Sequence, residues 1–218
     1  MCHEFRSSLE LSQGFGVSSA GACRDTPPAG THVPAEVGHY EEVTIHSDHP
    51  FLPPEGERDP LRRFRGRLAA PVTVWTVASA GERAGLTVSS MLVADGDPGG
   101  LLALVDEDSE FWDVAQSAAS VAVSLLAWEH RGLADAFAGT APAPGGPFKM
   151  ARWNDTTWGP VLEGAVGWIG ARFVQEPPRH VGWGLLLEAA IEHVEVNGDA
   201  EALTHVRGRY RQPDIPKM

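Results

Sequence analysis

Cysteine is scarce in this 218-residue chain, whose only two, Cys2 and Cys23, lie near its beginning. Without thiols in the remainder, neither a disulfide framework nor a four-thiolate metal site can hold the body of the protein together. This composition predicts a cytoplasmic protein. The first residues also lack a basic start followed by an apolar stretch, so we expect no secretory signal.

Long apolar runs and an excess of positive charge are also missing. No uninterrupted apolar run approaches the ~20 residues that a membrane-spanning helix needs, so we expect no membrane span. Lys and Arg number 17 against 29 Asp and Glu, which gives a formal net charge of −12. A charge of that sign repels phosphate backbones and anionic lipid surfaces. The composition therefore argues against nucleic acid and membrane partners.

The composition changes near residue 60. Residues 1–60 contain five of the nine His, none of the seven Trp and seven of the twelve net negative charges. An acidic segment that is rich in Pro and Gly and has no hydrophobic period cannot bury enough apolar surface to offset its ordering entropy. We therefore predict a disordered acidic extension over residues 1–40. Residues 41–60 are predicted to be a Pro-rich lead-in with one short strand.

From Leu61 onward the apolar residues recur mostly with period two, which predicts strands. Residues 71–78 and 86–94 are expected to form a hairpin, and further strands are predicted at 101–105, 121–127, 165–174, 183–196 and 203–206. Short helices are predicted at 109–118 and 129–139, with a long loop over 140–160. The fold class is therefore mainly β, a small antiparallel barrel over residues 61–211 followed by a tail at 212–218.

The segment AGLTVSSM, residues 84–91, is the strongest candidate for a ligand site. On a strand it places Thr87 and Ser89 on one face and Val88 and Ser90 on the other. Small side chains let a ligand lie close to the backbone, whose amides then bind the heteroatoms of a flat ring or the oxygens of a phosphate. A flavin needs both. The alternative is that these hydroxyls simply cover the solvent side of a strand.

The common motifs of covalent and metal-dependent catalysis are missing. The chain contains no G-x-S-x-G elbow, no H-E-x-x-H helix and no phosphate-binding P-loop. No catalytic side chain and no metal ligand are therefore predicted.

Across residues 61–211, the order of motifs resembles the flavin reductase-like family. The matching segments are PVTVWTV, AGLTVSSM, SEFWD, LLAWEHRGLADAFAG, WGPVLEGAVGWIGARFV and HVRGRYR. The resemblance implies a split β-barrel that binds FMN and passes hydride from NAD(P)H to the flavin. It also implies a homodimer with the flavin near its interface, and a separate monooxygenase that accepts the reduced flavin.

The resemblance also implies which residues contact the cofactor. In the family, the T-x-S-S segment lines the flavin, a Ser before the next helix contacts the ribityl chain or phosphate, and the Phe of the FAG motif borders the site. These positions are Thr87, Val88, Ser89, Ser90, Ser109 and Phe137. The closing segment would add His205, Arg207, Arg209 and Tyr210, for which a solvated charge cluster is the alternative.

A departure from the family pattern leaves alternatives open. Family members often carry an Asp-His pair that helps to seat the nicotinamide, and here that place reads Gly182-Trp183. This favours, as an alternative, a flavin-binding or electron-relay protein without efficient NAD(P)H turnover. A barrel that binds no flavin and serves as an interaction module is the second alternative.

A separate objection to a phosphate near Ser109 is electrostatic. Three carboxylates, Asp106, Glu107 and Asp108, precede Ser109 and would repel a phosphate placed there. The candidates for a compensating positive charge are Arg131, Arg207 and Arg209.

Overall fold

The computed structural model describes residues 59–174, 177–198 and 200–212. The predicted extension over residues 1–40, nearly all of the predicted lead-in and residues 213–218 lie outside the described part. Among the described residues, no helix is long and apolar enough to cross a membrane.

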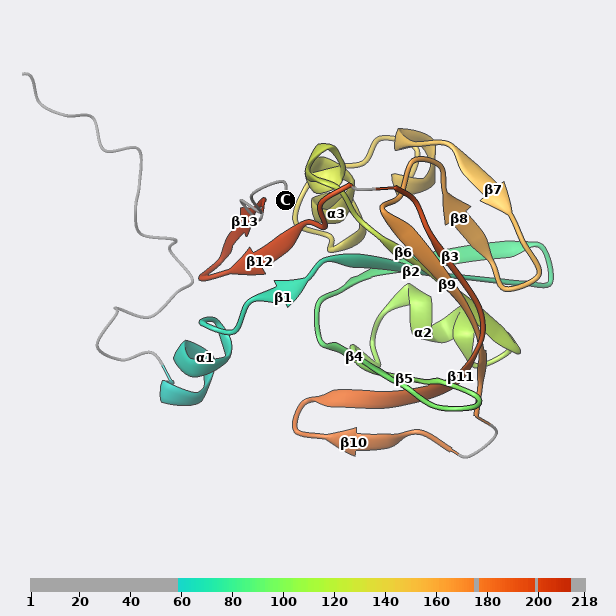
Figure 1. The fold of residues 1–218 in the computed structure, drawn as a ribbon, viewed down its shortest axis with the longest axis horizontal. Coiled ribbons are helices and arrows are strands. Elements are labelled where there is room, and N and C mark those ends of the chain that lie inside the picture. Colours follow the sequence, from blue (N-terminus) through green and yellow to red (C-terminus); the bar gives the residue numbers. More distant parts are fainter. Residues whose placement is uncertain (1–58, 175–176, 199, 213–218) are drawn as a thin grey trace, which may run out of the picture. The chain divides into compact units, whose positions relative to one another are not determined.

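Most of the strands belong to one curled antiparallel sheet (Figure 1). Its order is β3-β2-β6-β9-β11-β5-β4, and β10 pairs with β11 outside this path. The strands are β2 (Thr73–Ser79), β3 (Glu82–Val88), β4 (Met91–Ala94), β5 (Gly100–Val105), β6 (Ser120–Leu125), β9 (Gly167–Phe173), β10 (Arg179–Val181) and β11 (Gly184–Val196).

Two smaller sheets and several short helices complete the described part. β1 (Ala70–Pro71), β12 (Thr204–Val206) and β13 (Arg209–Arg211) form one sheet, and β7 (Trp153–Asp155) pairs with β8 (Pro160–Leu162). The helices are α1 (Pro60–Arg65), α2 (Glu110–Ala115) and α3 (Arg131–Phe137), with 3₁₀ turns η1 (Trp128–His130) and η2 (Pro147–Met150). The predicted mainly β, antiparallel barrel-like fold is confirmed.

The large sheet closes on itself where β3 passes into β4. These strands are consecutive in the chain, yet they occupy opposite ends of the strand order. Only Ser89 and Ser90 separate them, so the two edges of the sheet must meet at this point. Two hydrogen bonds hold the crossing: the Thr73 hydroxyl donates to the Val88 carbonyl at 2.6 Å, and the Leu104 amide donates to the Ser90 carbonyl at 2.9 Å.

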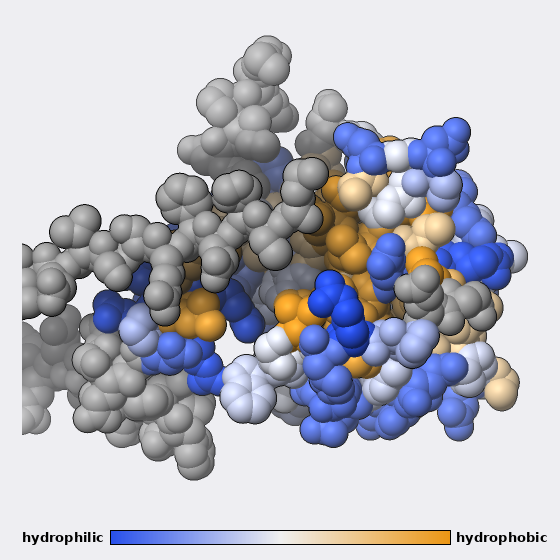
Figure 2. All heavy atoms as spheres, turned by 90° about the horizontal axis from the view of Figure 1, so that it is seen from below, coloured by the Kyte–Doolittle hydropathy of each residue, from blue (hydrophilic) through white to orange (hydrophobic). Residues whose placement is uncertain are grey.

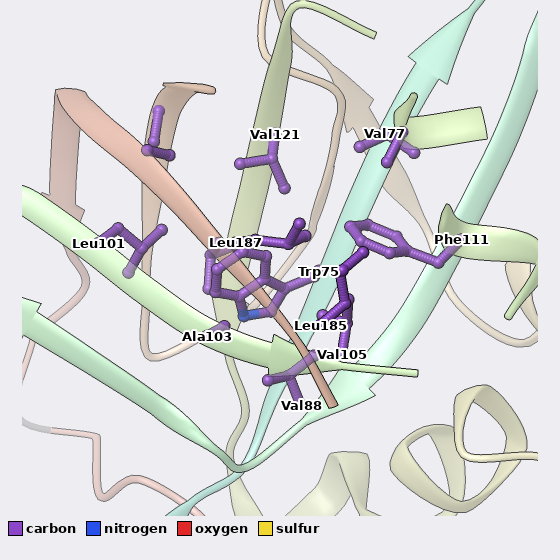
Figure 3. Packing of buried hydrophobic residues seen from close by; sticks show 14 of the residues in the cluster. Trp75, Val77, Val88, Leu101, Ala103, Val105, Phe111, Val121, Leu185 and Leu187 are labelled. Carbon is purple, nitrogen blue, oxygen red and sulfur yellow. The ribbon is translucent and has the colours of Figure 1, made fainter. Parts of the chain in front are cut away.

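The main hydrophobic core fills the inside of the curl (Figure 3). Alternate residues of β5 and β11 point inward, as the two-residue period of a strand requires. Trp75 of β2 is fully buried among them, and Phe111 of α2 packs against the same cluster. Full burial of a large apolar side chain contributes ~1.5–3 kcal/mol, so this cluster is the main source of the barrel's stability.

A second core cluster joins α3 to the other side of β3. Phe137 is buried there, edge-on to Phe148 and Trp153 at centroid distances of 5.1 and 5.6 Å. Its ring lies so close to β3 that a Cβ at Gly85 would be 2.6 Å from its Cε1 atom. Glycine at position 85 therefore allows α3 to pack directly against the strand that leads into Ser89.

The structure differs from the sequence-based prediction at the start of the domain. Residues 60–65 form helix α1, not a continuation of the strand pattern. Asp59 caps this helix by accepting a hydrogen bond from the Leu61 amide at 2.9 Å, and Pro60 occupies the first helical position. Both are favourable at a helix start, which explains why a six-residue segment with little apolar content is helical.

Three further segments differ. The predicted strand over 86–94 is broken at Ser89, and its second half, β4, pairs with β5 instead of β2. The predicted loop over 140–160 contains η2 and β7, and β8 begins at its last residue. The segment after residue 206 continues as strand β13, which pairs with β12.

Candidate functional site

Two adjoining grooves meet at the crossing between β3 and β4. The first has a volume of about 770 Å³ and lies between α1, the segment 89–92 and β5. The second, of about 390 Å³, lies between β3, α3 and the β12–β13 hairpin. Ser89 and His205 line both grooves. Cavities of this size accommodate small-molecule cofactors, so the seam of the sheet is the candidate site.

The backbone at this seam offers unused hydrogen-bond donors. Ser89 and Ser90 lie outside the strand ladders, and both are half-buried. Within the described part of the chain, neither their amides nor their hydroxyls have a hydrogen-bond partner. Half-buried donors with small side chains beside a groove are suited to bind the polar edge of a ligand.

Thr87 lines the second groove, but its hydroxyl already has a structural role. It donates a hydrogen bond to the Ala134 carbonyl at 2.7 Å and so links β3 to α3. A ligand in the groove can therefore contact the Thr87 side chain while the position of the strand stays fixed.

The β12–β13 hairpin brings His205 and Tyr210 to the grooves. They face each other across the two strands, with their rings in a T-shaped arrangement at 5.6 Å. The Tyr210 hydroxyl donates to Asp135 Oδ1 at 2.7 Å and thereby ties the hairpin to α3. Burial raises the pKa of Tyr210, and the hydrogen bond to Asp135 and the charge of Asp135 raise it further. The phenol therefore stays neutral at physiological pH.

The predicted arginines of the hairpin lie outside both grooves. Arg207 and Arg209 are exposed and do not line either cavity. Arg207 sits in the hairpin turn with φ +53°, and its amide donates to the Gly66 carbonyl at 2.6 Å, which joins the turn to the end of α1. Arg131, the third candidate for a compensating charge, packs over the Trp128 ring at 4.9 Å.

Three predicted site residues do not reach the grooves with their side chains. Val88 and Phe137 are 3% and 5% exposed and belong to the two core clusters. Ser109 caps α2, where its hydroxyl accepts from the Trp112 amide and donates to the Asp106 carbonyl. Val88 can reach a ligand only through its backbone, and Phe137 supports β3 from behind.

Four polar or charged residues that line the grooves were not predicted: Arg62, Arg65, Asp135 and Thr140. The helix signal for α1 was present, because an Asp-Pro pair precedes the two arginines and marks a helix start. Asp135 falls on the polar face of the predicted helix over 129–139. No local pattern indicates that this face meets Tyr210, since the contact depends on the fold.

A curled antiparallel sheet whose seam carries grooves lined by both polar and apolar residues has the architecture of a ligand-binding barrel. The sequence profile described as "Flavin reductase like domain" matches residues 65–214. The chain belongs to this family.

Individual relatives agree with the family assignment. The chain is 30% identical to the FMN reductase (NADH) RutF of Ancylobacter novellus over 158 residues, which cover 72% of this chain and 86% of the relative. It is 24% identical to the 4-hydroxyphenylacetate 3-monooxygenase reductase component of Pseudomonas aeruginosa, over 75% of this chain and 96% of the relative. The NADH:FAD oxidoreductase SgcE6 of Streptomyces globisporus has a similar fold, with a TM-score of 0.65, 24% identity and coverage of 77% and 98%.

The link between Tyr210 and Asp135 can be tested through the pH dependence of stability. Because the folded-state pKa of Tyr210 is raised, the neutral phenol stabilises the fold fully below the unfolded-state pKa of ~10, and this contribution is lost as pH rises further. We expect the free energy of unfolding, measured with denaturant, to fall more steeply above about pH 10 in the parent than in Tyr210→Phe. Parallel curves for the two proteins would contradict the assignment.

Proposed function

We propose that this protein is an NAD(P)H-dependent FMN reductase that binds its flavin at the seam between β3 and β4. The observation that carries the proposal is the pair of amides at Ser89 and Ser90, which have no hydrogen-bond partner among the described residues and lie beside grooves large enough for the cofactor, in a chain of this family. The FMN reductase (NADH) named among the relatives supports the same activity. Support for flavin and nicotinamide together comes from SgcE6, whose structure has also been solved in complex with NAD and FAD fragments.

The residues present fit a cofactor that has a flat ring and a phosphate group. Ser89 and Ser90 leave the backbone approachable, and their amides would bind the polar groups of the cofactor, either heteroatoms of the ring or oxygens of the phosphate. Leu102, Leu104 and Leu186 add an apolar side to the first groove. A bound flavin supplies a ring that accepts hydride from reduced nicotinamide, and the protein contributes orientation and partial exclusion of water.

The proposed contacts fall into two groups. Thr87, Ser89, Ser90, His205 and Tyr210 line the grooves and would touch the cofactor directly, and Val88 would contribute its backbone. Phe137 would act indirectly, because it holds β3 in place from the second core cluster. We propose no direct contact for Ser109, Arg207 or Arg209, whose side chains lie outside both grooves.

Two measurements on the purified protein test the function. Quenching of FMN fluorescence on addition of protein would show binding, and its absence would favour a barrel that binds no flavin. Anaerobic addition of NADH or NADPH should then bleach the visible absorption of the flavin in repeated turnovers. Binding without bleaching would contradict the reductase assignment and favour an electron-relay protein.

The position of the flavin can be tested at Ser89. If a small side chain is needed there so that the ring can approach the backbone, Ser89→Ala should bind FMN nearly as well as the parent. Ser89→Leu should lose at least about tenfold in affinity, which corresponds to ~1.4 kcal/mol. Fluorescence titration measures both, and a melting curve checks that both variants fold. Equal affinities for Ala and Leu variants would place the flavin elsewhere.

We further propose that the protein is a cytoplasmic homodimer whose reduced flavin is used by a separate monooxygenase. The low cysteine content supports the location. The Pseudomonas aeruginosa relative, named as the reductase component of a monooxygenase, supports the acceptor. Support for the dimer comes from an apolar groove of about 270 Å³ beside β4 and β11, bordered by Val93, Val194 and Val196, which are 48%, 58% and 73% exposed.

The dimer can be tested on this apolar surface. A charge at Val194 would have to be desolvated if a second copy covers the groove, so Val194→Asp should shift the sedimenting species from twice the chain mass to one chain mass. Val181→Asp is the matched control, because Val181 is an exposed strand residue outside the groove. A parent that sediments as a monomer, or a Val194→Asp variant that stays dimeric, would contradict the proposal.

A further inference from the structure

The first groove has an unusual charge for a protein of net charge −12. Among the described residues, no carboxylate lines it, whereas two arginines, Arg62 and Arg65 of α1, do. Ser89 and Ser90, whose amides and hydroxyls have no partner in the part of the chain that the structure describes, line the same groove. The groove thus combines two guanidinium groups with uncommitted donors, which is the donor set that binds phosphate.

The fold holds these two arginines on one side of α1. Residues three apart in a helix lie on the same face, so Arg62 and Arg65 are presented together. The end of α1 is fixed to the β12–β13 hairpin, because the Gly66 carbonyl accepts a hydrogen bond from the Arg207 amide at 2.6 Å. Figure 2 shows hydrophilic side chains, in blue, around α1 at the left of the view.

The other cations considered for this role are less suitable. Arg131 packs over the Trp128 ring, and its Nη1 donates to the Trp128 carbonyl at 3.0 Å. Arg207 and Arg209 line neither groove. The Ser109 end of α2 is flanked by Asp106, Glu107, Asp108 and Glu110, which disfavour a dianion there.

We propose that Arg62 and Arg65 of α1 bind the phosphate of the flavin, together with Ser89 and Ser90, and so make this enzyme select phosphorylated flavins over riboflavin. This assignment rests on the proposed function. It places the phosphate end of the cofactor in the first groove, beside α1. The ring end then extends past Ser89 toward Thr87 and Tyr210 in the second groove, where Asp135 would repel a phosphate.

The test compares FMN with riboflavin, which carries no phosphate, by fluorescence titration of the full chain. The parent should bind FMN about ten- to a hundredfold more tightly, as expected for hydrogen bonds to a charged group. The double variant Arg62→Ala/Arg65→Ala should lose this preference and keep its riboflavin affinity, which also shows that it folds. Salt should weaken FMN binding in the parent more than in this variant. Arg63→Ala is the matched control, because Arg63 belongs to the same helix but does not line the groove.

The outcomes separate this inference from the proposed function. If the parent binds neither flavin, the proposed function fails. If the parent binds both equally, or the double variant keeps the preference for FMN, the phosphate assignment fails while the flavin reductase assignment stands. A double variant with unchanged FMN preference and a raised KM for NADH would assign the arginines to the dinucleotide phosphates, which also overturns the proposal.

Discussion

The candidate site depends on a two-residue crossing that carries the chain from one edge of the curled sheet to the other. Strands β3 and β4 belong to opposite edges of the sheet. Ser89 and Ser90 lie between these strands and outside both strand ladders. Bonds from the Thr73 hydroxyl and the Leu104 amide fix the carbonyls of Val88 and Ser90, while the serine amides have no partner among the described residues. Half-buried donors of this kind remain available to a ligand in the adjoining grooves, which makes the seam the candidate binding site.

The elements around the seam provide a groove with opposite charges at its two ends. α1 contributes arginines at one end, and α3 contributes Asp135 at the other, where the Tyr210 hydroxyl holds its carboxylate. A hydrogen bond to the Gly66 carbonyl ties the end of α1 to the β12–β13 hairpin. A hydrogen bond from the Thr87 hydroxyl ties α3 to β3. An elongated ligand with one anionic end would therefore bind in a single direction.

Local sequence patterns predicted much of the fold and only part of the candidate site. The two-residue period located strands β5 and β11, and the helix predicted at 109–118 contains α2. The break at Ser89 could not be read from LTVSSMLVA, because residues suited to strands stand on both sides of it and the pairing partner changes only in three dimensions. The positive charge that would compensate a phosphate was expected from arginines near the flavin motifs. The arginines that line the first groove instead come from α1. This helix is distant in sequence from His205, which lines the same groove.

The central claim is that the Ser89 and Ser90 amides hold the cofactor. The most direct measurement is a titration of FMN into protein labelled with ¹⁵N-serine, followed through the amide resonances of the chain. Large, saturable shifts of the Ser89 and Ser90 signals, with the Ser109 signal nearly unchanged, are the predicted result. If FMN binds and leaves both seam serines unperturbed, the cofactor lies elsewhere on the barrel.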